Sequence, residues 1–185
     1  MRVNPSTDTV RAAFVPLMND PSFAESRKLL EKGLPIAEML QAMAAHPDLL
    51  ASFSEFGKFV YPGGLLERPL KERVILKASL MNECQFCTES HTALMKNLGI
   101  SSDPQSELKR EVSRLPERDQ LALEYTEYVT TRSNEVPESL FSQLRACFSE
   151  AEIVELTFLI GFINMLNRFN NALGVRYHGD YSKGH

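Results

Sequence analysis

The chain has 185 residues, 43% hydrophobic and 24% charged, a composition typical of one folded domain and unlike that of a disordered chain. Its formal net charge of −4, without a block of like charges, argues against nucleic-acid binding, which needs a basic surface. No apolar stretch reaches the ~18–20 residues of a membrane span, and Met1–Asp20 lacks the apolar core of a signal peptide. We therefore expect a cytoplasmic protein that binds neither nucleic acid nor membrane.

The first segment, residues 1–22, is predicted to be an extended N-terminal arm. It is polar and is interrupted by Pro5, Pro16 and Pro21, so the only regular structure expected in it is one helical turn near Thr9–Phe14. Helical periodicity and the positions of Gly and Pro then predict three helices, at Phe23–Lys32, Ile36–Ala45 and from Pro47 or Asp48 to about Val60.

The remainder of the chain also follows the helical period. The predicted helices are Leu70–Met81, Cys84–Leu98, a short piece at Glu107–Val112, Glu117–Thr131, one from Pro137 through Cys147, and a long apolar one from Ser149 to about Phe169. Ser149 and Glu152 form the pattern of a capping box at the start of the last helix. No stretch shows the two-residue alternation of a strand, so we predict an all-α fold, with a helical domain at residues 23–175 and a polar, frayed tail at 176–185.

The run Cys84-Gln85-Phe86-Cys87-Thr88-Glu89-Ser90-His91 concentrates the reactive side chains of the chain. Residues three and four apart share one face of a helix, so Cys84, Cys87 and His91 are expected to be neighbours. The N–H groups at the helix start and a histidine able to accept a proton both favour a thiolate, the nucleophilic form of cysteine. The spacing therefore predicts a dithiol that cycles to a disulfide, either through a sulfenic acid formed with a peroxide or by thiol–disulfide exchange.

The histidine needs a partner that fixes its tautomer, and Glu72 on the preceding helix is the candidate. A bend at Asn82-Glu83 would bring Glu72 back over the cysteine pair. Glu83 and Glu89 remain as alternatives, although both are expected to be solvated.

Two other interpretations of the cysteine pair remain open. Cys84, Cys87 and His91 could supply three zinc ligands, with Glu72 or water as a fourth, and the two cysteines could also be a buried structural pair. The third cysteine, Cys147, is expected to be a buried apolar side chain. No glycine-rich phosphate loop is present, and we predict no cofactor and no bound metal.

A weak internal repeat accompanies the motif. Glu72, Cys84, Cys87 and His91 have the same spacings as Glu152, Asn164, Asn167 and Asn171. This pattern suggests a duplicated helix–joint–helix unit in which the first copy carries reactive side chains and the second carries amides.

The signature Glu72-x(11)-Cys84-x-x-Cys87-x-x-x-His91 resembles that of the AhpD-like alkylhydroperoxidase branch of the carboxymuconolactone decarboxylase superfamily. The segments His46–Leu50, Leu70–Leu76 and Glu152–Leu156 resemble the same family, so the similarity covers roughly residues 36–175. The resemblance implies a multi-helix bundle that assembles into trimers or hexamers. It also implies an antioxidant peroxidase or disulfide oxidoreductase, whose dithiol reduces hydroperoxides and is recharged by a lipoyl-bearing protein or another thiol donor.

By the same resemblance, Cys87 attacks the peroxide, Cys84 resolves the product and meets partner proteins, and His91 with Glu72 relays protons. The family relay has a further histidine just before the second cysteine, and this chain has Phe86 there, so the relay is shortened. A non-catalytic metal-binding or redox-sensing thiol protein is the alternative. Lactone decarboxylation is the less favoured branch, since decarboxylase members generally lack the cysteine pair.

Overall fold

A computed structural model describes residues 1–17 and 19–179, and in these residues every regular element is helical. The α-helices are α1 (Thr7–Phe14), α2 (Ala24–Glu31), α3 (Glu38–Ala44), α4 (Pro47–Gly57), α5 (Arg68–Met81), α6 (Gln85–Asn97), α7 (Pro104–Arg110), α8 (Glu117–Arg132), α9 (Glu138–Cys147) and α10 (Glu150–Leu173). Short 3₁₀ turns lie at Val15–Leu17, Pro21–Phe23, Val112–Arg114 and Ser133–Glu135. The predicted all-α class is confirmed.

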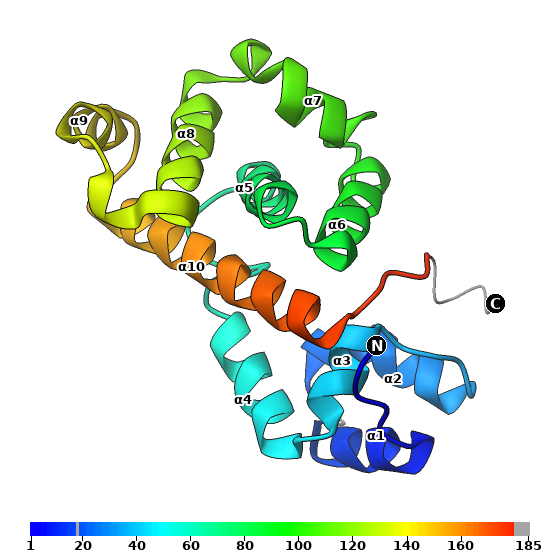
Figure 1. The fold of residues 1–185 in the computed structure, drawn as a ribbon. Coiled ribbons are helices and arrows are strands. Elements are labelled where there is room, and N and C mark those ends of the chain that lie inside the picture. The colour runs from blue at the N-terminus through cyan, green and yellow to red at the C-terminus, as the bar shows by residue number, and fades with distance from the viewer. Residues whose placement is uncertain (18, 180–185) are drawn as a thin grey trace.

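Helix α5 lies at the centre of the bundle and packs against α6, α8 and α10 (Figure 1). Buried positions lie on most of its sides and include polar as well as apolar residues, because neighbouring helices surround it. Leu70, Val74, Leu76 and Ala78 are completely buried, and so are Lys71 and Glu72 beside them. A buried charge needs a partner, so Lys71 and Glu72 are expected to make ion pairs or hydrogen bonds inside the core.

Helix α10 crosses the whole molecule, with α1–α4 on one side and α5–α9 on the other (Figure 1). The predicted capping box forms, since the Ser149 hydroxyl accepts the Glu152 N–H and the Glu152 carboxylate accepts the Ser149 N–H. The helix then runs without a break to Leu173, and Gly174 ends it with a left-handed backbone (φ 63°). The suggested second helix–joint–helix unit therefore has no joint.

The N-terminal segment is not an extended arm. Residues Thr7–Phe14 form α1, whose Ser6 cap accepts the Thr9 N–H at 3.1 Å, and α1 buries Val10, Ala13 and Phe14. These apolar positions share one helical face, and the Phe14 ring meets Phe23 edge-on at 5.4 Å. The prolines that suggested an extended segment lie outside this helix and only limit its length.

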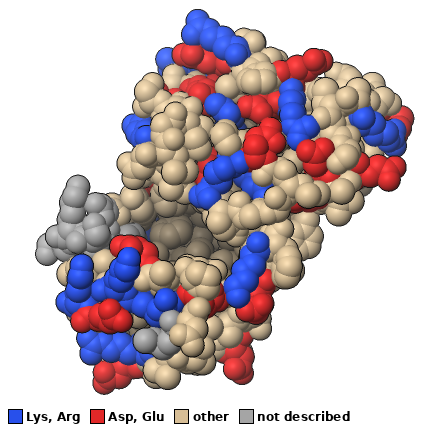
Figure 2. Space-filling model, turned by 180° about the vertical axis from the view of Figure 1, so that it is seen from behind, with Lys and Arg blue, Asp and Glu red and all other residues tan. Residues whose placement is uncertain are grey.

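Surface charges of both signs are interspersed over the face shown in Figure 2, without an extended area of one sign. The same view shows a hollow lined by uncharged residues between the two groups of helices. Across the described residues, none of the helices combines the length and the hydropathy that crossing a bilayer would require.

Candidate functional site

The cysteine pair lies at a sharp joint between α5 and α6. Helix α5 ends at Met81, Glu83 adopts a left-handed backbone (φ 52°), and Cys84 is the N-cap of α6. The Cys84 N–H donates to the Ser79 carbonyl at 3.0 Å, which ties the joint back onto α5. The predicted bend at Asn82-Glu83 is therefore present, and it aims the start of α6 at α10.

The two sulfur atoms of Cys84 and Cys87 lie 2.8 Å apart, and both residues are free thiols. Their relative exposures are 0% and 3%. A disulfide bond is about 2.05 Å long, so the pair is close to bonding distance without a change of backbone.

The position of Cys84 favours its ionised form. The pKa of Cys84 falls to about 7, chiefly because the Cys87 thiol donates to it. Burial opposes this shift, whereas the Cys87 N–H at 3.4 Å and the Asn167 and Asn170 amides assist it. The pKa of Cys87 is raised, because its proton is held by Cys84 and because it is buried. The pair therefore carries its first negative charge on Cys84, at the positive end of α6.

Glu72 is the partner of His91, as the sequence predicts. The Nδ1 atom of His91 lies 2.6 Å from Glu72 Oε2, and the carboxylate is completely buried. Burial alone would raise the pKa of Glu72, but the hydrogen bonds from His91, Tyr61 and Arg68 hold it below its ordinary value. Of the other candidates, Glu83 is exposed at the joint and Glu89 accepts from the Gln85 amide at 2.9 Å.

Tyr61 and Arg68 were not identified from the sequence, although they complete the contacts of Glu72. The Tyr61 hydroxyl donates to Glu72 Oε1 at 2.7 Å, and Arg68 Nε donates to the same oxygen at 2.5 Å. Arg68 Nη2 also donates to the Tyr61 hydroxyl at 2.8 Å. Arg68 precedes Glu72 by one helical turn, which was a usable signal, but Tyr61 lies in a loop whose path the sequence does not reveal.

That loop is held by a buried ion pair. Lys71 Nζ lies 2.5 Å from Glu155 Oε1 and donates to the Val60 carbonyl at 2.9 Å and to the Gly63 carbonyl. The Glu155 carboxylate in turn accepts the Leu65 N–H at 2.5 Å. These contacts between α5, α10 and the loop fix the segment that carries Tyr61.

The asparagines of α10 reach the cysteine joint. The Asn82 amide donates to the side-chain oxygens of Asn164 and Asn167 at 2.9 and 3.0 Å, and the Asn167 amide donates to the Ser79 hydroxyl at 3.1 Å. One turn further on, Asn170 Nδ2 lies 3.2 Å from Cys87 Sγ. The sequence marks Asn164 and Asn167 only as counterparts in the repeat, and it gives no sign of the role of Asn170.

Residues near the end of the described chain cover the outer side of the motif. Phe86 is buried and its ring faces Tyr177 edge-on, with centroids 6.4 Å apart. Arg176 Nη1 donates to the Gln85 side chain at 2.7 Å, and His178 Nε2 lies 2.7 Å from Glu38 Oε1. The expectation of a frayed tail is therefore wrong for residues 176–179, and its remainder, including His185, falls beyond the described residues.

Other candidate residues lie outside this site. Cys147 ends α9 and is half-buried against the core, and His46 caps α4 by accepting the Leu49 N–H at 3.3 Å. Residues 1–17 and 19–179 contain no group of three His, Cys, Asp or Glu side chains placed to hold a metal ion.

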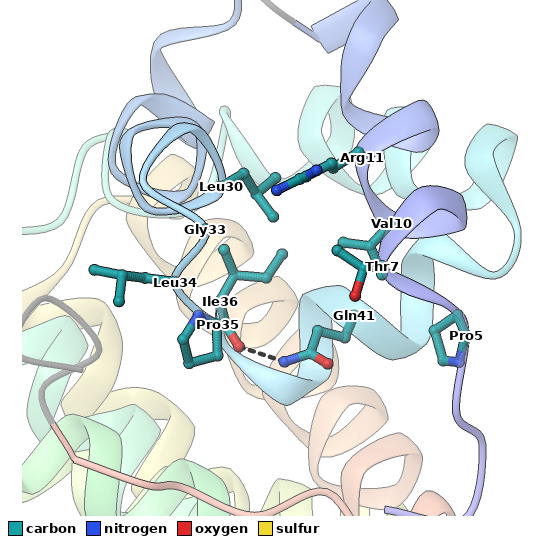
Figure 3. A pocket seen from close by; sticks show the side chains of 10 residues that line it. All are labelled: Pro5, Thr7, Val10, Arg11, Leu30, Gly33, Leu34, Pro35, Ile36 and Gln41. Atoms are coloured by element: carbon teal, nitrogen blue, oxygen red, sulfur yellow. Dashed lines mark hydrogen bonds between the residues drawn. The ribbon is translucent and has the colours of Figure 1, made fainter. Parts of the chain in front are cut away.

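A separate small cavity of about 240 Å³ lies between α1 and the segment before α3 (Figure 3). Its walls combine apolar side chains with the polar Thr7, Arg11 and Gln41. The Gln41 amide donates to the Ile36 carbonyl at 2.7 Å, which closes one side. The lining contains neither cysteine nor histidine, so the cavity lacks the chemistry of the cysteine site.

Three comparisons place this geometry in a family. The family model "Carboxymuconolactone decarboxylase family" matches residues 47–111, which include Glu72, both cysteines and His91. An uncharacterized protein of Bacillus subtilis (strain 168), YdfG, is 30% identical over 114 residues, covering 60% of this chain and 78% of its own.

Solved structures have the same fold. A peroxidase-related protein from Ralstonia eutropha JMP134, described as an alkylhydroperoxidase AhpD core, superposes with a TM-score of 0.75 at 19% identity, covering 99% of this chain and 95% of its own. A peroxidase-related protein from Silicibacter sp. TM1040 gives a TM-score of 0.71 at 25% identity, covering 90% and 92%. Both are uncharacterized. With the matched motif and the shared fold, the chain belongs to the AhpD-like branch of the carboxymuconolactone decarboxylase superfamily.

Proposed function

We propose that the protein is a thiol-dependent peroxidase and disulfide oxidoreductase that reduces hydroperoxides in a reducing, cytoplasmic compartment. The observation that carries this proposal is the approach of the Cys84 and Cys87 sulfurs to 2.8 Å at the start of α6, beside the hydrogen-bonded His91 and Glu72. The peroxidase-related names of the similar structures support the same general activity.

The first chemical step is the reduction of the hydroperoxide by Cys87. The Cys87 proton passes to Cys84, which holds the charge at rest, or to His91 one helical turn away. The Cys87 thiolate attacks an oxygen of the peroxide, an S–O bond forms and the O–O bond breaks. Sulfur loses two electrons to the peroxide, and the departing alkoxide takes up the transferred proton to leave as an alcohol.

The second step forms the disulfide. The Cys84 sulfur attacks the Cys87 sulfenic acid, an S–S bond forms, and the S–O bond breaks as hydroxide leaves and is protonated to water. A dithiol donor, such as a lipoyl-bearing protein, then reduces the disulfide by two thiol–disulfide exchanges and is itself oxidised to a disulfide. Glu72 holds His91 in one orientation through both steps, and Tyr61 and Arg68 hold Glu72.

The experiment is a stoichiometric oxidation followed by turnover. Reduced protein is mixed with hydrogen peroxide or an organic hydroperoxide, and we expect one equivalent to be consumed with the loss of two thiols. Turnover is expected when a dihydrolipoyl donor is added. Cys87→Ser abolishes both effects, whereas Cys147→Ser retains both. Inertness of the wild type toward several hydroperoxides and donors would refute the peroxidase.

A dithiol–disulfide exchange or redox-sensing role is the second candidate. It is favoured by Phe86, which occupies the position where the family relay has a further histidine, and by the burial of both sulfurs. This role predicts a disulfide that forms once, with no catalytic turnover of peroxide, so the turnover measurement with a dihydrolipoyl donor separates it from the peroxidase.

We also propose that the protein is a homo-oligomer, a trimer or a hexamer. An apolar surface, made of Phe56, Phe59, Val154, Phe158 and Met165, is exposed along α4, the residues just after it, and α10. Contiguous apolar areas of this kind are uncommon on monomers and are typical of association sites.

A further inference from the structure

Asn170 has an unusual environment for a buried amide. Its side chain is on α10 and only 1% of its surface is exposed. Its Nδ2 atom lies 3.2 Å from Cys87 Sγ and 3.7 Å from Met39 Sδ. Its Oδ1 atom is buried and accepts no hydrogen bond from any described residue.

The two sulfur contacts explain the orientation of the amide. A thioether sulfur only accepts hydrogen bonds, and the Cys87 thiol directs its proton to Cys84, so the N–H₂ end is the end that faces both sulfurs. A buried acceptor without a partner is unfavourable and is rare in native proteins. The Oδ1 atom is bonded to the same carbon as Nδ2, so the unpartnered acceptor belongs to the side chain that contacts the cysteine sulfur, where the first reaction product would form.

Asn167, one turn earlier on α10, shows what a purely structural amide looks like here. Its oxygen accepts from Asn82 and its nitrogen donates to Ser79, so both ends have partners that hold the joint. Asn170 has no such pair of structural partners. The difference indicates that the Asn170 side chain has a role in the chemistry of the thiol.

We propose that Asn170 is a catalytic residue whose N–H stabilises the Cys87 thiolate and whose Oδ1 accepts the O–H of the Cys87 sulfenic acid. The same amide would therefore donate to the Cys87 thiolate before the reaction and accept from the Cys87 sulfenic acid after it. The second half of this proposal rests on the proposed peroxidase function, because it needs a sulfenic acid. The first half concerns only the ionisation of the thiol.

The first experiment titrates the thiolates of the reduced protein by their ultraviolet absorbance. Asn170→Leu removes both polar ends at similar volume, and Asn170→Asp keeps the acceptors but replaces the donor with a negative charge. The Asn170 hydrogen bond favours the ionised form of both cysteines, so its loss in Asn170→Leu is expected to lower the thiolate fraction of the pair at neutral pH about tenfold. Asn170→Asp is expected to lower it further, because like charges repel.

Thr126→Val is the matched control. Thr126 is completely buried and its hydroxyl donates within α8, to the Ala122 carbonyl at 2.7 Å. This variant loses a buried polar group outside the cysteine site, so its thiolate titration should match that of the wild type. Titration curves of Asn170→Leu and Asn170→Asp that also match the wild type would overturn the donor role.

The second experiment follows the sulfenic acid in a Cys84→Ser background, in which it cannot condense to a disulfide. One equivalent of hydrogen peroxide is added, and the sulfenic acid is trapped with dimedone over time and measured by mass spectrometry. Asn170→Leu is expected to shorten its lifetime severalfold, whereas Asn170→Asp, which keeps an acceptor, retains it. Equal lifetimes with and without the Asn170→Leu substitution would overturn the acceptor role.

The two experiments also separate this inference from the proposed function. Titration needs no peroxide, so it decides the donor role even if the wild type shows no peroxidase turnover. If the wild type turns over peroxide normally but both Asn170 variants behave like it in titration and trapping, the inference fails and the proposed function stands.

Discussion

At the scale of single residues, the site depends on how one negative charge is held. Cys84 accepts hydrogen bonds from the Cys87 thiol and the Cys87 N–H at the start of α6, whereas Cys87, which is the donor, keeps its proton. Glu72 is ionised for a related reason, since three donors compensate for its burial. For both groups, burial raises the pKa and hydrogen bonds from nearby donors lower it. A charge can be kept in a protein interior only when such donors compensate for the loss of water.

The pH dependence follows from Cys84. Its folded pKa of about 7 lies below the ordinary thiol value, so the thiolate forms as pH rises through 7 and is lost as pH falls through it. We expect the rate of peroxide-dependent disulfide formation to rise about tenfold between pH 6 and 8 and to level off above pH 8. Stopped-flow measurement of thiol loss across this range gives the profile. A rate that climbs only near pH 9 would show that neither thiol is activated.

Glu72→Gln tests the orientation of His91. The amide can still hydrogen-bond to His91, but it cannot stabilise a protonated imidazole, so proton transfer should be impaired. We expect peroxide turnover to fall by about 10²-fold, in the range typical of lost acid–base assistance. Disulfide formation with a strong chemical oxidant should persist, which serves as the control for an intact cysteine pair. Unchanged peroxide turnover in Glu72→Gln would show that Glu72 does not assist proton transfer by His91.

At the scale of elements, the site depends on the joint between α5 and α6 and on the neighbours of that joint. The left-handed backbone of Glu83 turns the chain. Two side chains of α10, Asn164 and Asn167, accept hydrogen bonds from Asn82. Asn167 also donates to the Ser79 hydroxyl near the end of α5. The loop before α5 is held to the same two helices by Lys71 and Glu155. Helix α10 therefore serves as the common support for both halves of the site.

The buried Lys71–Glu155 pair should be important for stability. Lys71→Met leaves Glu155 largely buried without its cation and frees the loop carbonyls, so we expect a loss of roughly 3–5 kcal/mol in the free energy of unfolding. Arg114→Met is the control, because Arg114 pairs with Glu111 at the surface, where solvent screens the charges and the loss of stability should be far smaller. Urea unfolding of both variants measures the difference. Equal losses would mean that the buried pair does not anchor the loop.

At the scale of the whole molecule, two features extend beyond the cysteine site. Residues 176–179 cover Gln85 and Phe86 and are fastened to Glu38 of α3, so the end of the described chain lies over the cysteine motif. On another part of the molecule, the apolar surface of α4 and α10 faces solvent in the single chain. In the proposed homo-oligomer, a second copy of the chain would cover this surface.

Assembly through the apolar surface can be tested with Phe59, whose side chain is 81% exposed. Phe59→Lys places a charge in the proposed interface, so we expect the wild type to sediment as an oligomer and the variant to dissociate at least about tenfold more readily. Val15→Lys alters an exposed apolar residue elsewhere and should sediment like the wild type. Sedimentation velocity at several concentrations provides the measurement. A monomeric wild type would contradict the prediction.

Helical periodicity and caps identified most elements, because these are local properties. Pro47 at the start of α4 and the Ser149–Glu152 capping box at the start of α10 both act as the sequence predicts. The prediction failed at α1, where closely spaced prolines concealed an eight-residue amphipathic helix. It failed again at residues 176–179, whose polar side chains find partners far away in sequence.

The sequence by itself determined the all-α class, the family and the grouping of Cys84, Cys87, His91 and Glu72, because residues at helical spacing share a face and the bend between two helices is short. The tertiary structure alone decided which cysteine holds the charge, which groups support Glu72, and that Asn170 touches the thiol. These depend on contacts between α5, α6, α10 and a loop, which no local pattern encodes. The physical reason is that ionisation in a protein interior is set by the sum of burial and directed donors, and those donors come from segments distant in sequence.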